Sequence, residues 1–326
     1  MENLNLLYIT TANPLAQGDL LEVGILHGLR TILGDNCVDY PEKKVMYHDW
    51  SNTKKDSLHG RGFTLYKLPI KNIDAQKRNN ILNIKFDAIL FGTLGQYDGY
   101  PEYKFIYDNY DESKIWYLDG HDLYGTAPIM KIYDEEYIIG NQKKNSFKRE
   151  LVFLEKNIYP TGFGIPEYQI KPIDLSIKNK LLPKTAPSSA IFGNDPELGT
   201  RKHHVFTEED PYYKDMQESW FGVTCKKGGW DCLRHYEIIA SGALLLFKDY
   251  DKKPPLCSPQ NLPCYSYSSK EELDHIMNRL VINNKPTDDY VDMLNQQRQW
   301  LFKNATTTAR AKYIVDTIKS NLYATI

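Results

Sequence analysis

The sequence predicts an α/β fold in two lobes, and three features of the chain indicate it. The 326 residues exceed a typical single domain of roughly 100 to 200 residues. Short apolar runs alternate with apolar stripes at helical spacing in both halves. A segment from about 159 to 188, dense in proline, glycine and polar residues, separates the halves. These features predict two Rossmann-like lobes that face a cleft.

The N-terminal half opens as a strand, a polar loop and a helix. Residues 4–10 form an apolar run rich in strand formers, and apolar residues from Leu20 to Leu33 recur at helical spacing. Gly34 follows where a helix commonly stops. The nearly continuous apolar run 86–94 is typical of a buried parallel strand. Further elements are expected as strands at 63–70 and 114–118 and as a short helix at 77–84.

The C-terminal half alternates in the same way after a boundary near residues 170 to 185. We divide the chain into a domain of residues 1–170, a domain of residues 171–310 and a last helical segment, 311–326. The elements expected after the boundary are strands at 189–193, 221–224 and 243–247 and helices at 212–220, 232–241, 271–280, 290–301 and 306–322.

Composition limits the partners and the location that we expect. The formal net charge is −2, with 40 basic and 42 acidic residues, so no global electrostatic attraction for nucleic acid or an anionic membrane is indicated. The five cysteines lack metal-site spacing, and we interpret them as free thiols in a reducing compartment. No run of ~18 apolar residues and no signal peptide is evident, which predicts a cytoplasmic protein without a membrane span.

The most informative segment is 228–247, GGWDCLRHYEIIASGALLLF. A glycine turn leads into a predicted helix that carries Arg234 and Glu237, and an apolar strand follows. The segment resembles the donor-binding element of GT-B glycosyltransferases of the family-4-like, group 1 type, with the pattern R-x-(F/Y)-E-x-x-A-(C/S)-G-A. The resemblance covers roughly residues 185 to 315 and is only topological over 1–170. It implies that the final helix crosses back to brace the N-terminal lobe.

The resemblance implies a role for each polar residue of this element. Glu237 would hold the ribose hydroxyls of the donor nucleotide, and Gly228 and Gly229 with the helix N-terminus would face the diphosphate, because unpaired helix amides favour an anion. Arg234, one turn before Glu237, would pair with a diphosphate oxygen. Gly229 stands where many retaining members have a first glutamate, so the stereochemical outcome stays open. The alternative is an ordinary ion pair of Arg234 and Glu237 on a solvated surface.

A polar cluster follows the predicted strand 114–118. It contains Asp119, His121 and Asp122, and the carboxyl ends of strands are where ligands bind in open α/β sheets. The resemblance makes the N-terminal domain the acceptor side. If the reaction inverts the anomeric carbon, a carboxylate or imidazole must take the proton of the acceptor hydroxyl, and these three residues are our catalytic candidates. A turn that merely caps the strand is the alternative.

Two more polar segments are candidates for binding phosphate or acceptor. Arg201 and Lys202 follow a predicted strand and would neutralise the leaving diphosphate, with plain surface charge as the alternative. Gln17, Gly18 and Asp19 form a polar turn after the first strand and would touch acceptor or phosphate. No GxGxxG fingerprint and no Walker motif occurs, which argues against dinucleotide redox enzymes and P-loop NTPases.

The sequence therefore predicts a glycosyltransferase that moves a hexosyl or pentosyl group from a nucleoside diphosphate sugar to an acceptor hydroxyl, in glycan biosynthesis. The donor would bind in domain 171–310 and the acceptor in domain 1–170. No obligatory metal and no other cofactor is expected, because no DxD motif follows a strand. Three alternatives stay open: a DNA-modifying, phage-type glycosyltransferase, which the near-zero charge makes less favoured; a nucleotide-sugar epimerase or hydrolase; and a non-catalytic sugar-nucleotide-binding module.

Overall fold

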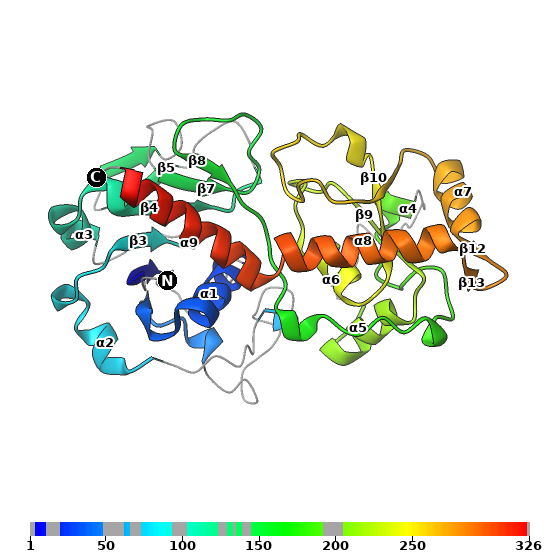
Figure 1. Cartoon of the computed structure of the whole chain (residues 1–326), viewed down its shortest axis with the longest axis horizontal. Helices are drawn as coiled ribbons and strands as arrows, with labels where there is room; N and C mark the ends of the chain where they lie inside the picture. Colours follow the sequence, from blue (N-terminus) through cyan, green and yellow to red (C-terminus); the bar gives the residue numbers. More distant parts are fainter. Residues whose placement is uncertain are drawn as a thin grey trace.

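The chain folds into two α/β lobes that lie side by side (Figure 1). Within the described part of the chain, no helix is both long and apolar enough to cross a membrane. The computed structural model describes residues 4–10, 20–47, 62–65, 73–92, 103–122, 129–132, 135–138, 145–191 and 205–324.

The N-terminal lobe is built on a six-stranded parallel sheet in the order β2-β1-β3-β4-β7-β8. Because the strands are parallel, their carboxyl ends meet at one edge of the sheet, where Asp119 closes β4 and pairs in register with Lys148 at the end of β7. The elements are β1 (Leu6–Ile9), α1 (Leu20–Leu33), β2 (Cys37–Tyr40), α2 (Ala75–Asn79), β3 (Ala88–Phe91), α3 (Tyr103–Asn109), β4 (Ile115–Asp119), the antiparallel pair β5 (Ile129–Ile132) and β6 (Glu135–Ile138), β7 (Asn145–Lys148) and β8 (Ile158–Pro160).

The C-terminal lobe has a three-stranded parallel sheet in the order β11-β10-β9. Residues 244–247 of β10 are fully buried, as expected of a continuous apolar strand in the centre of a parallel sheet. The elements are α4 (Ser188–Ile191), α5 (Glu209–Gln217), β9 (Phe221–Cys225), α6 (Leu233–Ala240), β10 (Leu244–Lys248), β11 (Tyr265–Tyr267), α7 (Lys270–Leu280), the hairpin of β12 (Val281–Ile282) and β13 (Lys285–Pro286), α8 (Asp288–Asn304) and α9 (Thr307–Ala324).

The last helix, α9, lies on the N-terminal lobe against α1, although it follows the C-terminal lobe in the chain (Figure 1). Gly28 of α1 permits this close approach, because a Cβ at that position would collide with the carbonyl of Thr307. His27 Nδ1 lies 2.7 Å from Thr307 Oγ1, and burial lowers the pKa of His27 to about 4. The chain therefore crosses between the lobes a second time at the α8–α9 junction.

The predicted strands at 4–10, 86–94, 114–118, 221–224 and 243–247 are confirmed, but two others are wrong over the described residues. Residues 188–191 of the expected strand 189–193 form the helix α4. Pro187, whose fixed φ suits a helix start, accepts hydrogen bonds at its carbonyl from Ala190 and Ile191. In the expected strand 63–70, residues 62–65 form a turn with positive φ at Gly62 and Thr64, which a strand does not allow. Residues 66–70 lie outside the described ranges.

Candidate active site

The carboxyl edge of the N-terminal sheet holds an aspartate between a histidine and a lysine. Asp119 Oδ1 lies 3.1 Å from His121 Nδ1, and Asp119 Oδ2 lies 2.7 Å from Lys148 Nζ. Burial by itself raises the pKa of Asp119, but the hydrogen bond from His121 and the charge of Lys148 outweigh burial and hold this pKa below its ordinary value. The ionised carboxylate favours the His121 tautomer with its proton on Nδ1, which leaves Nε2 as the basic nitrogen. The His121 side chain is 25% exposed, so a ligand can approach it.

Arg149, the residue after β7, ties this edge to the C-terminal lobe. Its Nε and Nη2 donate to the carbonyl of Gly120 at 3.1 and 2.9 Å, and its Nη2 also pairs with Asp122. Its Nη1 donates to the carbonyl of Asp231, in the loop before α6, at 2.8 Å. One buried guanidinium therefore spans the two lobes. We call Asp119, His121, Asp122, Lys148 and Arg149 the β4–β7 group.

The glycine turn before α6 packs directly against residues of the N-terminal lobe. A Cβ on Gly228 would collide with the Asp122 carboxylate, and a Cβ on Gly229 would collide with the carboxylate of Glu150. The Asp122 side chain is 51% exposed and has room to move, whereas the Glu150 side chain is fully buried. The turn thus approaches the N-terminal lobe closely because neither position carries a side chain.

Two buried carboxylates complete this lobe contact. Glu150 Oε1 accepts a hydrogen bond from the Asp231 amide at 3.0 Å, while its Oε2 has no partner among the described residues. Burial raises the pKa of Glu150. Asp231 accepts from the Tyr236 hydroxyl at 2.6 Å and from the Phe163 amide at 2.8 Å.

Within the described ranges, no set of three histidine, cysteine, aspartate or glutamate side chains is placed to hold a metal ion.

Glu237 on α6 forms a second group, built from hydroxyls. It is only 6% exposed, and its two carboxylate oxygens accept hydrogen bonds from Tyr212 Oη and Thr64 Oγ1. Thr64 Oγ1 also lies 2.5 Å from Tyr213 Oη, and the Thr64 amide donates to Glu209 at 2.7 Å. Since Thr64 belongs to the N-terminal lobe, Glu237 also bridges the lobes. A solvated surface ion pair, the alternative raised by the sequence, does not describe this buried carboxylate.

Arg234 lies close to Tyr212 and Glu237, one helical turn before the latter. Burial alone lowers the pKa of Arg234, but the neighbouring Tyr212, Cys232 and Glu237 outweigh it and raise the pKa, so the guanidinium stays charged. Its Nε is buried without a hydrogen-bond partner among the described residues. Cys232 at the N-cap offers only a weakly accepting thiol, so no strong side-chain cap from this residue competes with an anion for the first amides of α6. We call Thr64, Tyr212, Arg234 and Glu237 the α6 group.

Comparison with solved structures shows which fold this arrangement belongs to. A glycosyltransferase from Rickettsia africae ESF-5 has a TM-score of 0.51 at 10% identity, over 99% of this chain and 99% of that chain. AviGT4, a glycosyltransferase involved in avilamycin A biosynthesis, has a TM-score of 0.53 at 9% identity, over 98% of each chain. Sucrose-phosphate synthase from Thermosynechococcus elongatus has a TM-score of 0.51 at 10% identity, over 98% of this chain and 99% of that chain.

The chain has the GT-B fold. The predicted fold class, two Rossmann-like lobes in a GT-B arrangement, is therefore confirmed. No protein-family model matches the sequence, and no curated protein does either. At about 10% identity the likeness concerns the fold, and the chemistry has to be argued from the side chains of this chain.

The structure brings some of the predicted site residues together. Of the three catalytic candidates, Asp122 contacts the glycine turn that was assigned to the donor, and Arg234 and Glu237 lie further along, on α6. The other predicted site residues, Arg201 and Lys202 for the diphosphate and Gln17, Gly18 and Asp19 for the acceptor or phosphate, lie outside the described residues and stay predictions.

Several residues that sequence reasoning did not single out as site residues, Lys148 among them, take part in these contacts. Arg149 and Glu150 were missed because β7 was not predicted, although a charged pair directly after a strand is a signal for a sheet edge. Asp231 lies inside the segment 228–247, but the pattern of that segment assigns it no role. Thr64 and Tyr212 come from distant parts of the chain, and no local pattern points to their contact with Glu237.

Proposed function

We propose that the protein transfers a sugar from a nucleoside diphosphate sugar to an acceptor hydroxyl, with donor on the C-terminal lobe and acceptor on the N-terminal lobe. The observation that carries the proposal is the contact of Asp122, the residue directly after His121, with the glycine turn at the start of α6. This contact supports a proton acceptor on one lobe close to a glycine turn on the other that is suited to an anion.

In this proposal His121 is the general base. Nε2 takes the proton of the acceptor hydroxyl while Asp119, held by Lys148, stabilises the imidazolium that forms. The acceptor oxygen bonds to the anomeric carbon as the bond from that carbon to the phosphate oxygen breaks, and the electron pair leaves with the nucleoside diphosphate. Direct displacement inverts the anomeric carbon, so the anomer of the product, read by NMR, checks this assignment.

The donor side is proposed on α6. The first-turn amides and the Arg234 guanidinium stabilise the negative charge on the leaving diphosphate without an obligatory metal. Glu237 already accepts two hydroxyl hydrogen bonds, from Tyr212 and Thr64. A ribose diol offers the same two hydroxyl donors, so we assign Glu237 to the ribose and expect the diol to displace at least one of these protein hydroxyls.

A donor screen tests the proposal. Thermal unfolding is followed with UDP, GDP, ADP, CMP and dTDP and with their sugars, on the wild type, on Glu237→Gln and on the exposed control Glu271→Gln of α7. A ligand at a hundredfold excess over its Kd adds about 2.7 kcal/mol to the free energy of unfolding. We expect one nucleotide class to raise Tm in the wild type and in Glu271→Gln but much less in Glu237→Gln. A folded protein that responds to none of them contradicts the proposal.

Turnover then separates transfer from the other activities of this fold. With the selected donor, release of nucleoside diphosphate is measured with and without glycan acceptors, with DNA, and with a chelator. Acceptor-dependent release that persists in chelator supports metal-independent transfer. Release without any acceptor indicates a hydrolase, donor isomerisation indicates an epimerase, and binding without turnover indicates a sugar-nucleotide-binding module.

A further inference from the structure

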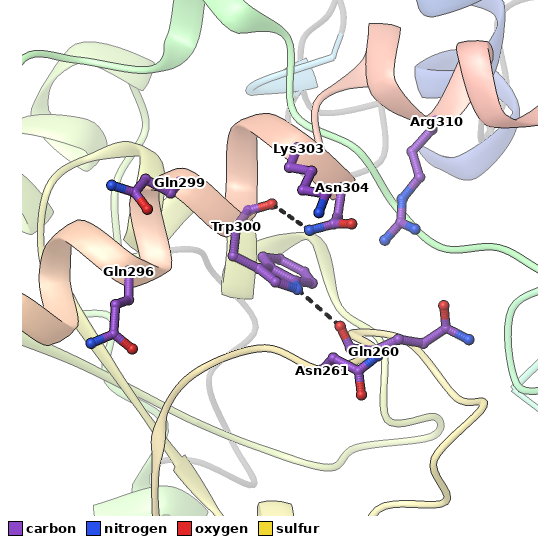
Figure 2. Close-up of a pocket in the computed structure, with 8 residues that line it drawn as sticks. All are labelled: Gln260, Asn261, Gln296, Gln299, Trp300, Lys303, Asn304 and Arg310. Carbon is purple, nitrogen blue, oxygen red and sulfur yellow. Dashed lines mark hydrogen bonds between the residues drawn. The ribbon is translucent and has the colours of Figure 1, made fainter.

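A polar pocket of about 460 Å³ lies at the α8–α9 junction, apart from the β4–β7 and α6 groups (Figure 2). Among the described residues, its lining includes two cations, Lys303 and Arg310, and no acidic side chain. Trp300 fixes one wall, because its Nε1 donates to the carbonyl of Gln260 at 2.9 Å. The remaining lining is made of carboxamides, from Gln260, Asn261, Gln296, Gln299 and Asn304.

Arg310 is the decisive residue of the pocket. It is 7% exposed, and its Nε donates to the carbonyl of Phe163 at 3.2 Å. Its Nη2 is buried and has no hydrogen-bond partner among the described residues, and the interaction given for its guanidinium is with the neutral Tyr236 side chain, with no ion pair to a carboxylate of the described ranges. A buried cation without an anion is costly, and an anion in the pocket would lower that cost. Figure 2 shows the guanidinium pointing toward the space in front of Gln260 and Asn261.

We propose that this pocket binds a phosphorylated sugar, as a second site outside the donor and acceptor sites of the proposed function. Lys303 and Arg310 supply two positive charges for the phosphate. The carboxamides each offer donors and acceptors, which suits the hydroxyls of a sugar. The volume lies in the usual range for small-molecule sites, about 300 to 1,000 Å³.

The pocket is placed to link the lobes. Lys303 lies in the last turn of α8 in the C-terminal lobe, and Arg310 lies in the first turn of α9 on the N-terminal lobe, so one ligand contacts both sides of the crossing (Figure 1). Trp300 stacks on Tyr236 with ring centroids 6.2 Å apart and planes 6° apart, and the Tyr236 hydroxyl donates to Asp231 at the lobe contact. Occupancy of the pocket therefore bears on how the two lobes are held together.

Calorimetric titration without any donor sugar tests the site, so its result does not depend on turnover. The probes are glucose 6-phosphate, glucose, inorganic phosphate and UDP, and the proteins are the wild type, Lys303→Gln, Arg310→Gln and the exposed control Lys312→Gln of α9. We expect one glucose 6-phosphate site, weakened about two- to fivefold in Lys303→Gln and about tenfold or more in Arg310→Gln, and unchanged in Lys312→Gln and in Glu237→Gln.

Several results overturn the proposal. Equal binding of inorganic phosphate, or of glucose, removes the need for a phosphorylated sugar. Competition by UDP, or loss of binding in Glu237→Gln, assigns the ligand to the donor site instead. Absence of binding, or binding that Lys303→Gln and Arg310→Gln leave unchanged, rejects the pocket. Because Arg310 is buried, thermal melting of Arg310→Gln is first compared with that of the wild type by circular dichroism. If Arg310→Gln unfolds, the variant of the exposed Lys303 still tests the site.

Discussion

The two groups at the lobe interface are built from different chemistry. The β4–β7 group is made of charges, with Asp119 between His121 and Lys148 and with Arg149 reaching across to the other lobe. The α6 group centres on one buried carboxylate, Glu237, which is held by hydroxyl groups. Paired charges beside a histidine can control which ring nitrogen carries the proton. A carboxylate that accepts hydrogen bonds from hydroxyls is suited to bind a diol.

This difference separates proton transfer from donor binding. In the first group, His121 is partly exposed, and the Asp119–Lys148 ion pair behind it fixes its orientation. In the second group the carboxylate is buried, so any ligand must compete with Tyr212 and Thr64. Changes in the first group should therefore act on kcat, and changes in the second on donor affinity.

The largest effect is expected for His121→Ala. Loss of a general base costs roughly 10²- to 10⁴-fold in rate, and we expect kcat to fall by that factor with donor affinity nearly unchanged. Steady-state kinetics with the selected donor and acceptor measure it, and His275→Ala, an exposed histidine on α7, is the matched control. Wild-type kcat in His121→Ala would show that the β4–β7 group only caps a strand.

Glu237→Gln should act mainly on the donor. The amide keeps an acceptor oxygen but loses the charge and one acceptor, and a hydrogen bond to a charged group contributes about 1.5 to 3 kcal/mol. We expect the donor Kd to rise roughly 10- to 100-fold, with a smaller change in kcat. If kcat falls and the Kd stays constant, the division of roles between the two groups is wrong.

Gly229→Ala probes the contact between the lobes. The added methyl meets the fully buried Glu150 carboxylate, and overpacking of this kind costs about 1 to 3 kcal/mol. Gly228→Ala is the matched control, because the half-exposed Asp122 can move aside. Urea unfolding should show a clear loss of stability for Gly229→Ala and little loss for Gly228→Ala. The double variant that combines Gly229→Ala with Glu150→Ala should recover part of the lost stability. Equal losses of stability in the two variants would show that the Glu150 side chain moves away from the added methyl as easily as the Asp122 side chain.

The smallest effects concern pH. The contributions of Asp119 and Glu150 to stability should change with pH in opposite directions. The pKa of Asp119 is lowered by folding, so its stabilisation is complete above the ordinary value of 3.8 and is lost as the pH falls through the lower folded value. The pKa of Glu150 is raised above 4.5, so its contribution is greatest below 4.5 and declines as the pH rises through the folded value.

Urea unfolding across a range of about pH 3 to pH 8 measures both contributions. Asp119→Asn should flatten the loss of stability on the acid side, and Glu150→Gln should flatten the decline above pH 4.5. Profiles that change in the same direction in both variants contradict the assignment of opposite shifts.

Regular elements with strong periodicity were predictable, and short or irregular ones were not. The helical stripe from Leu20 to Leu33 matches α1 at both ends, and the run ALLLF matches β10 closely, because apolar residues mark the whole length of each element. The strand β7 spans four residues, too few to show a period, and α4 was mistaken for a strand because SAIF is as apolar as a strand.

By itself, the sequence determined the alternating α/β order, the two-lobed fold and the polar residues that follow β4 and precede α6, because these depend on local composition and spacing. Only the tertiary structure decided that Arg149 reaches Asp231, that Glu150 lies against Gly229, and that Thr64 and Tyr212 meet at Glu237. These residues lie between about 25 and 173 positions apart in the chain. Contacts over such separations follow from how two lobes pack, and no local pattern in the sequence encodes them.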